Sequence, residues 1–177
     1  MKRFALLLLA ALLCMNTMAL AEPAVSNVKE YPVLEIKDGE FDRAKLIQLA
    51  IDNQVNSYAP YSEYNVSAAV LMDSGIVYLG ANVENASFPA GGCAETNAIR
   101  HAVNCGERRI IAIAIVGGMN YEVHDYCAPC GICRQVMREF CNPAEMKVIF
   151  AVSVTEYKEM TLEELLPESF GPDTLGM

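Results

Sequence analysis

Cys93-Ala94-Glu95 and Pro129-Cys130-Gly131-Ile132-Cys133 are the two most informative stretches of this chain. Together they offer three thiolate ligands and a carboxylate two residues after the first of them. Structural zinc sites use four protein ligands, whereas three leave one position open for water, as in catalytic sites. A carboxylate beside that water, but not on the metal, can carry its protons. We therefore expect one zinc ion per chain on Cys93, Cys130 and Cys133, with Glu95 as the catalytic acid and base.

The same cysteines have two other interpretations. A disulfide framework is common in exported proteins. Cys127, Cys130 and Cys133 also form a second, evenly spaced series that could supply metal ligands. The combination of Cys-Ala-Glu with Pro-Cys-x-x-Cys favours zinc over disulfides, and Pro129 next to Cys130 favours the set that includes Cys93.

The N-terminus has the three-part pattern of a secretory signal peptide. Lys2 and Arg3 form a basic start, residues 4–13 are an unbroken apolar run, and Ala19-Leu20-Ala21 is a small-x-small cleavage site. A membrane anchor is the alternative, but the run is too short to span a bilayer. We expect residues 1–21 to be removed and the mature protein to be exported, periplasmic or extracellular, with no further membrane association.

Length and charge limit what the mature chain can be. Residues 22–177 suffice for one domain with a real core, which we place at 41–177 after an N-terminal arm at 22–40. Of 13 Lys and Arg residues, two lie in the signal peptide, so 11 remain against 22 Asp and Glu. This balance leaves no basic patch for a phosphate backbone, so we expect no nucleic-acid partner and favour a neutral small molecule.

Apolar spacing and turn signals predict helices alternating with strands. The helices are expected at 42–58, 94–104, 131–140 and 162–166, and the strands at 66–72, 76–81, 110–116 and 146–152, with a turn at 73–75. The first helix is expected to present one apolar face, made of Ala44, Ile47, Ile51, Val55 and Tyr58. The alternation predicts an α/β fold whose sheet is covered on both faces. Cys93 and Cys130 would then begin two helices, where free N–H groups stabilise thiolates.

Five motifs together indicate a family. They are Tyr61-Ser62, Asn82-Val83-Glu84-Asn85-Ala86, Cys93-Ala94-Glu95, Pro129-Cys130-Gly131-Ile132-Cys133-Arg134-Gln135 and Leu165-Leu166-Pro167-Glu168-Ser169-Phe170-Gly171-Pro172. In this order, over roughly residues 41–176, the sequence resembles the short homotetrameric cytidine deaminases. The resemblance implies a zinc-dependent deaminase domain at 41–177, built as a three-layer α/β/α sandwich around a mixed, mostly five-stranded sheet. It also implies a homotetramer.

The activity implied by the resemblance is hydrolysis of cytidine and deoxycytidine to uridine and deoxyuridine, with release of ammonia, as in nucleoside salvage. Cys93, Cys130 and Cys133 match the zinc ligands of the family. Glu95 matches the proton shuttle that serves the zinc-activated water, the ring and the leaving amine. Two other functions remain open: deamination of another amine-bearing ring, as by blasticidin-S deaminases, and non-catalytic binding of zinc or a nucleoside by a secreted protein.

Substrate contacts are likewise implied by the resemblance. Asn82 and Glu84 match the pair that holds the ribose 3′-hydroxyl, since an amide can donate to a hydroxyl and a carboxylate can accept from it; a solvated strand end is the alternative. The other implied contacts are Tyr64 and Ala94 of the same chain and, from a neighbouring subunit, Phe170 and Phe88. For Phe170, a hydrophobic plug in its own subunit is the alternative.

Three positions depart from the family pattern. Tyr64 stands where the family usually has Phe, and Phe88 stands where it often has Tyr. Thr96 stands where the family usually has Arg, directly after the Glu of the motif. Three thiolates give Zn²⁺ a net negative centre, which makes its bound water less acidic. Without that guanidinium, and with Arg134 retained, we expect lower activity or a higher pH optimum.

Three cysteines of the mature chain are not used by the zinc: Cys105, Cys127 and Cys141. Cys105 and Cys141 lie 12 and 11 residues beyond Cys93 and Cys130, or roughly 17 Å along each helix. Two helices that start at one zinc ion must run side by side, so we expect a disulfide between Cys105 and Cys141. Two free buried thiols are the alternative. Cys127 is expected to stay unpaired and to be the thiol most exposed to oxidation.

Overall fold

The computed structural model describes residues 30–176, so the predicted signal peptide at 1–21 and most of the predicted arm lie outside the described residues. From Tyr31 onward the chain is one compact unit. Within it, the sheet contains the strands β1 (Tyr64–Met72), β2 (Val77–Ala81), β3 (Ile110–Met119), β4 (Lys147–Ala151) and β5 (Tyr157–Thr161). Their order is β2-β1-β3-β4-β5. β3 and β4 are parallel and the other pairs are antiparallel, which confirms the mixed five-stranded sheet.

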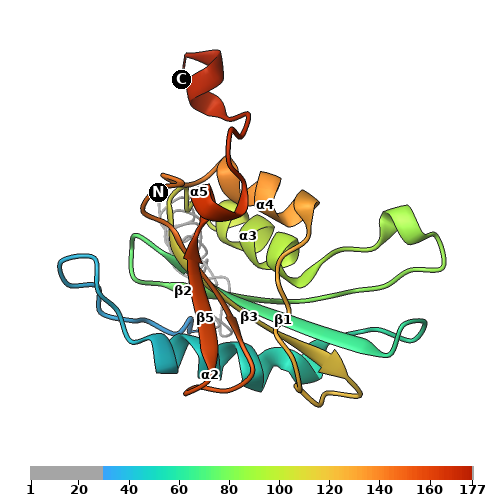
Figure 1. Cartoon of the computed structure of the whole chain (residues 1–177). Helices are drawn as coiled ribbons and strands as arrows, with labels where there is room; N and C mark the ends of the chain where they lie inside the picture. The colour runs from blue at the N-terminus through green and yellow to red at the C-terminus, as the bar shows by residue number, and fades with distance from the viewer. Residues whose placement is uncertain (1–29, 177) are drawn as a thin grey trace, which may run out of the picture. The chain divides into compact units, whose positions relative to one another are not determined.

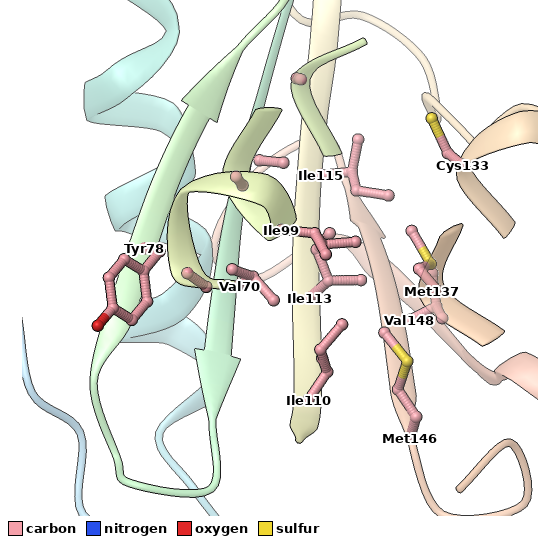
Figure 2. Close-up of a cluster of buried hydrophobic side chains, with 14 of the residues drawn as sticks. Val70, Tyr78, Ile99, Ile110, Ile113, Ile115, Cys133, Met137, Met146 and Val148 are labelled. Atoms are coloured by element: carbon pink, nitrogen blue, oxygen red, sulfur yellow. The ribbon is translucent and has the colours of Figure 1, made fainter. Parts of the chain in front are cut away.

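Helices cover both faces of this sheet (Figure 1). α2 (Arg43–Asn53) packs Leu46, Ile47 and Ala50 on one face. α3 (Ala94–Asn104), α4 (Gly131–Arg138) and α5 (Leu162–Leu165) lie on the other. Figure 2 shows this second core, where Ile99 of α3 and Met137 of α4 meet side chains of the central strands, with Cys133 at its edge. The predicted three-layer α/β/α sandwich is confirmed.

The central strands form because their sequences are apolar on both faces. In β3, every residue from Ala112 to Val116 is fully buried, as the unbroken apolar run predicts for a strand covered on both sides. β5 was not predicted. It is an edge strand whose residues are all exposed or half-buried, so its sequence carries no apolar run. Arg43 of α2 nevertheless anchors it through an ion pair with Glu159 at 2.6 Å.

The first helix is shorter than its apolar spacing predicts. Asp42 caps α2 by accepting a hydrogen bond from the Lys45 N–H, and the helix ends at Asn53 in the 3₁₀ turn η1 (Gln54–Asn56). Because a 3₁₀ turn has three residues per turn, the spacing of an α-helix does not continue through it. The predicted face is therefore wrong at Val55 and Tyr58, which are exposed, and it is also wrong at Ala44, which is exposed in the first turn of α2. Gln54 is buried in their place and donates to the Asn65 carbonyl of β1 at 2.9 Å.

The turns that position the later elements form where glycine predicts them. Gly75 closes the β1–β2 turn with φ +84°, and its carbonyl accepts from the Leu34 N–H. This contact holds the described part of the arm against the strands. Gly106, with φ +99°, follows the end of α3. None of the helices between residues 30 and 176 is both long enough and apolar enough to cross a lipid bilayer.

Candidate active site

Three cysteine sulfurs meet where α3 and α4 begin. Cys93 is the N-cap of α3, Cys130 is the N-cap of α4, and Cys133 lies in the first turn of α4. The Cys93 and Cys130 sulfurs are 4.0 Å apart, the Cys130 and Cys133 sulfurs are 3.5 Å apart, and all three lie within 4.8 Å of one another. Tetrahedral zinc with bonds of about 2.3 Å places its sulfurs about 3.8 Å apart. The cluster therefore fits one zinc ion without rearrangement of the fold.

The charge state of the cluster also favours a cation. The pKa of Cys93 is lowered to about 6, mainly because the Cys133 thiol donates a hydrogen bond to its sulfur. The same hydrogen bond, together with burial, raises the pKa of Cys133. One thiolate is thus stabilised by the protons of its neighbours. A metal ion that replaces those protons would take three negative ligands.

Cys127 lies outside this cluster. Its sulfur lies against Gly117 of β3, where a side chain would collide with it, and beside the ring of Tyr64. Burial raises the pKa of its thiol to about 11. Cys127 is half-buried, whereas Cys93, Cys105 and Cys130 are exposed, so the prediction that Cys127 is the thiol most open to oxidation is wrong.

Glu95 stands beside the sulfur cluster as the second residue of α3 and is 4% exposed. Burial raises the pKa of its carboxyl, although its own backbone N–H and the Cys133 thiol act in the opposite direction. A buried carboxyl that binds protons more readily is suited to accepting and returning them. The structure thus brings the predicted catalytic residue next to the predicted metal ligands.

A pocket of about 660 Å³ opens beside Cys93. Among the predicted substrate contacts, Asn82, Glu84 and Phe88 line it, and Tyr61, Ser62 and Ile132 are among its other lining residues. Glu84 accepts hydrogen bonds from the Tyr61 and Ser62 N–H groups at 2.8 and 3.2 Å through one carboxylate oxygen. Hydrogen bonds from Ser62 and Tyr61 lower the pKa of Glu84, which keeps it an acceptor at neutral pH.

Asn82 is fixed by three hydrogen bonds. Its Oδ1 accepts from the Ser57 hydroxyl at 2.5 Å and from the Val66 N–H at 2.9 Å, and its Nδ2 donates to the Tyr64 carbonyl at 2.9 Å. An amide nitrogen has two N–H donors, so one can point to a ligand. The pocket therefore presents a donor on Asn82 and an acceptor oxygen on Glu84, which together suit a hydroxyl group.

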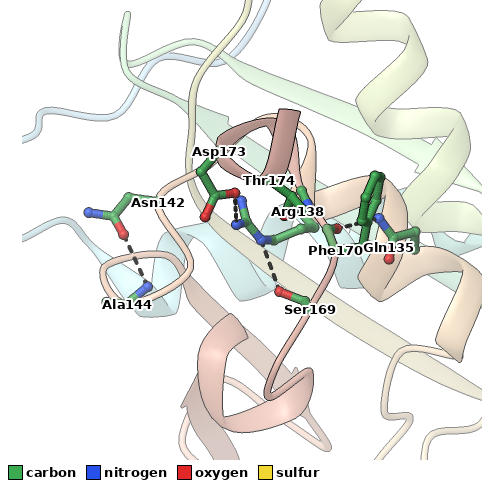
Figure 3. Close-up of polar contacts among 9 residues, drawn as sticks. Gln135, Arg138, Asn142, Ala144, Ser169, Phe170, Asp173 and Thr174 are labelled. Atoms are coloured by element: carbon green, nitrogen blue, oxygen red, sulfur yellow. Dashed lines mark hydrogen bonds and ion pairs between the residues drawn. The ribbon is translucent and has the colours of Figure 1, made fainter. Parts of the chain in front are cut away.

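Three predicted contacts are not among the residues that line this pocket. Tyr64 does not belong to the pocket lining; it is half-buried against Cys127, and burial raises its pKa to about 12. Ala94 is fully buried in the first turn of α3. Phe170 is 59% exposed on the C-terminal segment, where its carbonyl accepts from Gln135 of α4 at 3.0 Å (Figure 3). Phe88 lines the pocket of its own chain, so its contact with a neighbour stays a prediction.

Two residues that support the site were not predicted in these roles. Arg134 donates to the Pro129 carbonyl at 2.8 Å and to the Leu165 carbonyl at 2.7 Å, and so ties the loop before Cys130 to α5. Asn97 donates to the Ala81 carbonyl at 2.9 Å and holds α3 against the end of β2. A single sequence signal was available for Arg134, namely its place directly after the last ligand. For Asn97 the sequence offered none.

The predicted disulfide between Cys105 and Cys141 is not formed, and among the described residues both thiols are free. The prediction extended the second helix to residue 140, but α4 ends at Arg138. Cys141 lies in the turn beyond, where the Phe140 carbonyl accepts from the Ile110 N–H of β3. Cys105 caps α3, with its sulfur 3.6 Å from the Tyr31 hydroxyl. The chain thus turns towards the sheet before Cys141 can run alongside α3.

The fold and the three-thiol site define a class of zinc-dependent deaminases. Residues 42–151 match the sequence model of the family described as "Cytidine and deoxycytidylate deaminase zinc-binding region". The cytidine deaminase of Halalkalibacterium halodurans is 44% identical over 135 residues, which are 76% of this chain and 98% of that protein. For the one from Sporosarcina psychrophila, the identity is 37% over 76% of this chain and 96% of that protein. This chain belongs to the cytidine deaminase family.

Solved structures agree with this assignment. The crystal structure of cytidine deaminase from Burkholderia pseudomallei matches with a TM-score of 0.65 and 39% identity, and the match covers 71% of this chain and 97% of that one. That of Mycobacterium tuberculosis matches with a TM-score of 0.64 and 35% identity, over 75% and 99% of the two chains. The architecture is therefore shared over nearly the whole length of these relatives.

Proposed function

We propose that this chain hydrolyses cytidine and deoxycytidine to uridine and deoxyuridine, with release of ammonia. The observation that carries the proposal is the buried carboxyl of Glu95 beside three converging sulfurs, next to a pocket that offers hydroxyl-binding groups. Membership of the cytidine deaminase family supports this choice of substrate.

Each part of the site has a chemical task. Zinc, when bound by Cys93, Cys130 and Cys133, supplies an activated water as the nucleophile. Glu95 would accept the two protons of that water one after the other, passing the first to the ring nitrogen and the second to the leaving amine. Its raised pKa suits it to both directions of transfer, and its burial keeps competing solvent away from the exchanged proton.

The sugar is held at the other end of the pocket. Glu84 accepts a hydrogen bond from the ribose 3′-hydroxyl, and Asn82 donates one to it. Hydrogen bonds within the protein already hold both side chains in place for this contact. This contact does not involve the 2′ position, so we expect both ribose and deoxyribose to be accepted.

Uridine formation from cytidine, followed by the fall in absorbance or by chromatography, tests the proposal. The zinc-loaded protein should release one ammonia per uridine, and Glu95→Gln is the matched inactive control. Turnover of another amine-bearing ring, such as blasticidin S, without turnover of cytidine would assign the substrate differently. Nucleoside binding without any turnover would reduce the chain to a binding protein.

We further propose that the chain acts as a homotetramer whose active sites are completed across interfaces. The rim of the pocket is apolar and open, with Phe88 77% exposed and Ile132 72% exposed. Phe170, 59% exposed, lies outside the pocket lining of its own chain. A neighbouring copy that covers the rim and inserts Phe170 would bury these side chains.

Subunit mixing tests this arrangement sharply. Glu95→Gln and Phe170→Ala should each lower activity strongly when pure. Unfolding and refolding them together should restore activity, because some mixed sites combine an intact Glu95 with an intact Phe170. Absence of any recovery, or light scattering that gives a fully active monomer, would remove the shared site.

Export is a separate proposal and is supported by the N-terminal pattern alone. We propose cleavage after Ala21 and a mature protein that begins at Glu22. Cell fractionation and N-terminal sequencing of the recovered protein would test it. An intact Met1 on active protein in the cytosol would overturn it.

A further inference from the structure

Thr96 makes a contact that the reaction described above does not use. It is the third residue of α3 and is 4% exposed, and its hydroxyl oxygen lies 3.5 Å from the Cys133 sulfur of α4. Among the described residues, this sulfur is the one hydrogen-bond partner recorded for the Thr96 hydroxyl. The contact joins two helices across 37 residues of sequence, directly at a metal ligand.

The direction of this hydrogen bond follows from the chemistry of the ligand. Without metal, either the hydroxyl or the thiol can donate. A cysteine that binds zinc does so as a thiolate and has no proton left to give. In the zinc-loaded protein the Thr96 hydroxyl must therefore donate to the Cys133 sulfur.

Cys133 has more need of such a donor than the other two ligands. Cys93 and Cys130 are helix N-caps and are exposed in the single chain, so they are less shielded from water than Cys133. Cys133 is fully buried, and a buried charge without a hydrogen-bond partner is costly. The β-branched side chain of threonine is stiff about its first torsion angle, which helps to hold the hydroxyl in place.

We propose that Thr96 is a positioning residue for the zinc site: its hydroxyl fixes the Cys133 thiolate and withdraws negative charge from it. A less charged thiolate donates less to the metal, so the metal remains a stronger Lewis acid for its water. The role rests on the zinc site of the proposed function and is independent of which amine the enzyme removes.

The test compares Thr96→Val, which loses the hydroxyl at similar shape, with Thr96→Ser, which keeps it. Competition with a chromophoric chelator should show zinc affinity falling roughly 10-fold or more in the Val variant, as for other residues behind metal ligands. In the Co²⁺-substituted protein, the thiolate-to-cobalt charge-transfer band should move to lower energy in the Val variant, because the sulfur becomes more electron-rich. The Ser variant should stay close to the parent in both.

Thr155→Val is the matched control, because Thr155 is exposed and its hydroxyl contacts Ser153 rather than a cysteine. It should leave zinc affinity and the cobalt band unchanged. If the Val variant does not fold, Thr96→Ala provides the same comparison, since the cobalt band reports only on folded, metal-binding protein. Val or Ala variants with the parent's band and affinity, or a Ser variant as altered as Val, would overturn the proposal. Failure of the parent to deaminate cytidine would leave these metal readouts unaffected.

Discussion

The two ends of helices α3 and α4 differ in how strictly they are constrained. At their N-terminal ends, three sulfurs approach within 4.8 Å of one another. At their C-terminal ends, Cys105 contacts Tyr31, while Cys141 has already left its helix. A metal ion demands one geometry from both helix starts, whereas the length of each helix follows its own packing. The spacing of the motifs therefore predicts that the N-terminal ends of α3 and α4 converge, but it does not predict where their C-terminal ends lie.

The C-terminal end of α4 has a different task, which is to hold the end of the chain (Figure 3). Arg138, 7% exposed, donates to the Ser169 hydroxyl at 2.9 Å and forms an ion pair with Asp173. A side chain in place of Gly171 would collide with the guanidinium. The same eight-residue helix thus carries Cys133 of the sulfur cluster in its first turn and anchors the segment with Phe170 in its last.

Replacing a sulfur at the converging ends should have the largest effect. Cys133→Ser should bind zinc too weakly to retain it through purification, because the buried thiolate is lost from a three-ligand set. Deamination should fall to the background rate. Metal analysis of the purified variant checks this, with Cys141→Ser of the same helix region as the control that keeps one zinc. A zinc content equal to the parent's would exclude Cys133 from the ligand set.

Glu95→Gln, at the N-terminal end of α3, should lower the rate of deamination without affecting zinc binding. The amide has the shape of the carboxylate but cannot relay protons, so kcat should drop by about 10²–10⁴-fold or more. Zinc content and thermal unfolding should match the parent, because Glu95 is not part of the sulfur cluster. Single-turnover measurements on the zinc-loaded variant test this, and near-normal turnover would remove Glu95 from the mechanism.

The convergence of the N-terminal ends of α3 and α4 was predictable because these ends carry residue types that bind metals and transfer protons. Three cysteines and a carboxylate at this spacing have few other uses, and unbroken apolar runs such as Ile110–Val116 indicate central strands whatever surrounds them. The edge strand β5 lacks such a run and was missed.

Contacts between distant elements could not be predicted in the same way. The hydrogen bonds from Thr96 to Cys133 and from Arg138 to Ser169 each join residues more than 30 positions apart. They depend on how side chains face one another once the helices are packed. The Cys105–Cys141 disulfide failed for this reason: its argument needed α4 to continue past Arg138, and the pattern of a single helix does not report where tertiary contacts end it.

Loss of the C-terminal anchor should have a moderate effect on stability. Arg138→Met keeps the length of the side chain but leaves Ser169 and Asp173 without their partner, at an expected cost of about 1–3 kcal/mol. Limited proteolysis should then cut the segment after α5 earlier than in the parent, while zinc content stays at one per chain. Arg100→Met is the matched control, since Arg100 is exposed on α3. Equal proteolysis of all three proteins would show that Arg138 does not hold the segment.

The smallest effect is expected at Cys105 and Cys141, the two thiols near the C-terminal ends of α3 and α4. Burial raises the pKa of Cys141 to about 11, so its reactive thiolate is scarce at pH 8 and increases as the pH approaches 11. Cys105 is exposed and has no such protection from solvent. Brief alkylation with iodoacetamide at pH 8, read by peptide mass spectrometry, should therefore label Cys105 well before Cys141. The lag should shorten as the pH is raised, whereas simultaneous labelling at pH 8 would contradict the burial of Cys141.

The folded state binds the Cys141 proton more tightly than the unfolded chain does. Its stabilising contribution is thus complete below the ordinary thiol pKa and is lost as the pH rises through about 11. Cys141→Ala should accordingly flatten the alkaline fall in unfolding free energy without changing zinc content, and an unchanged alkaline slope would assign that fall to other groups.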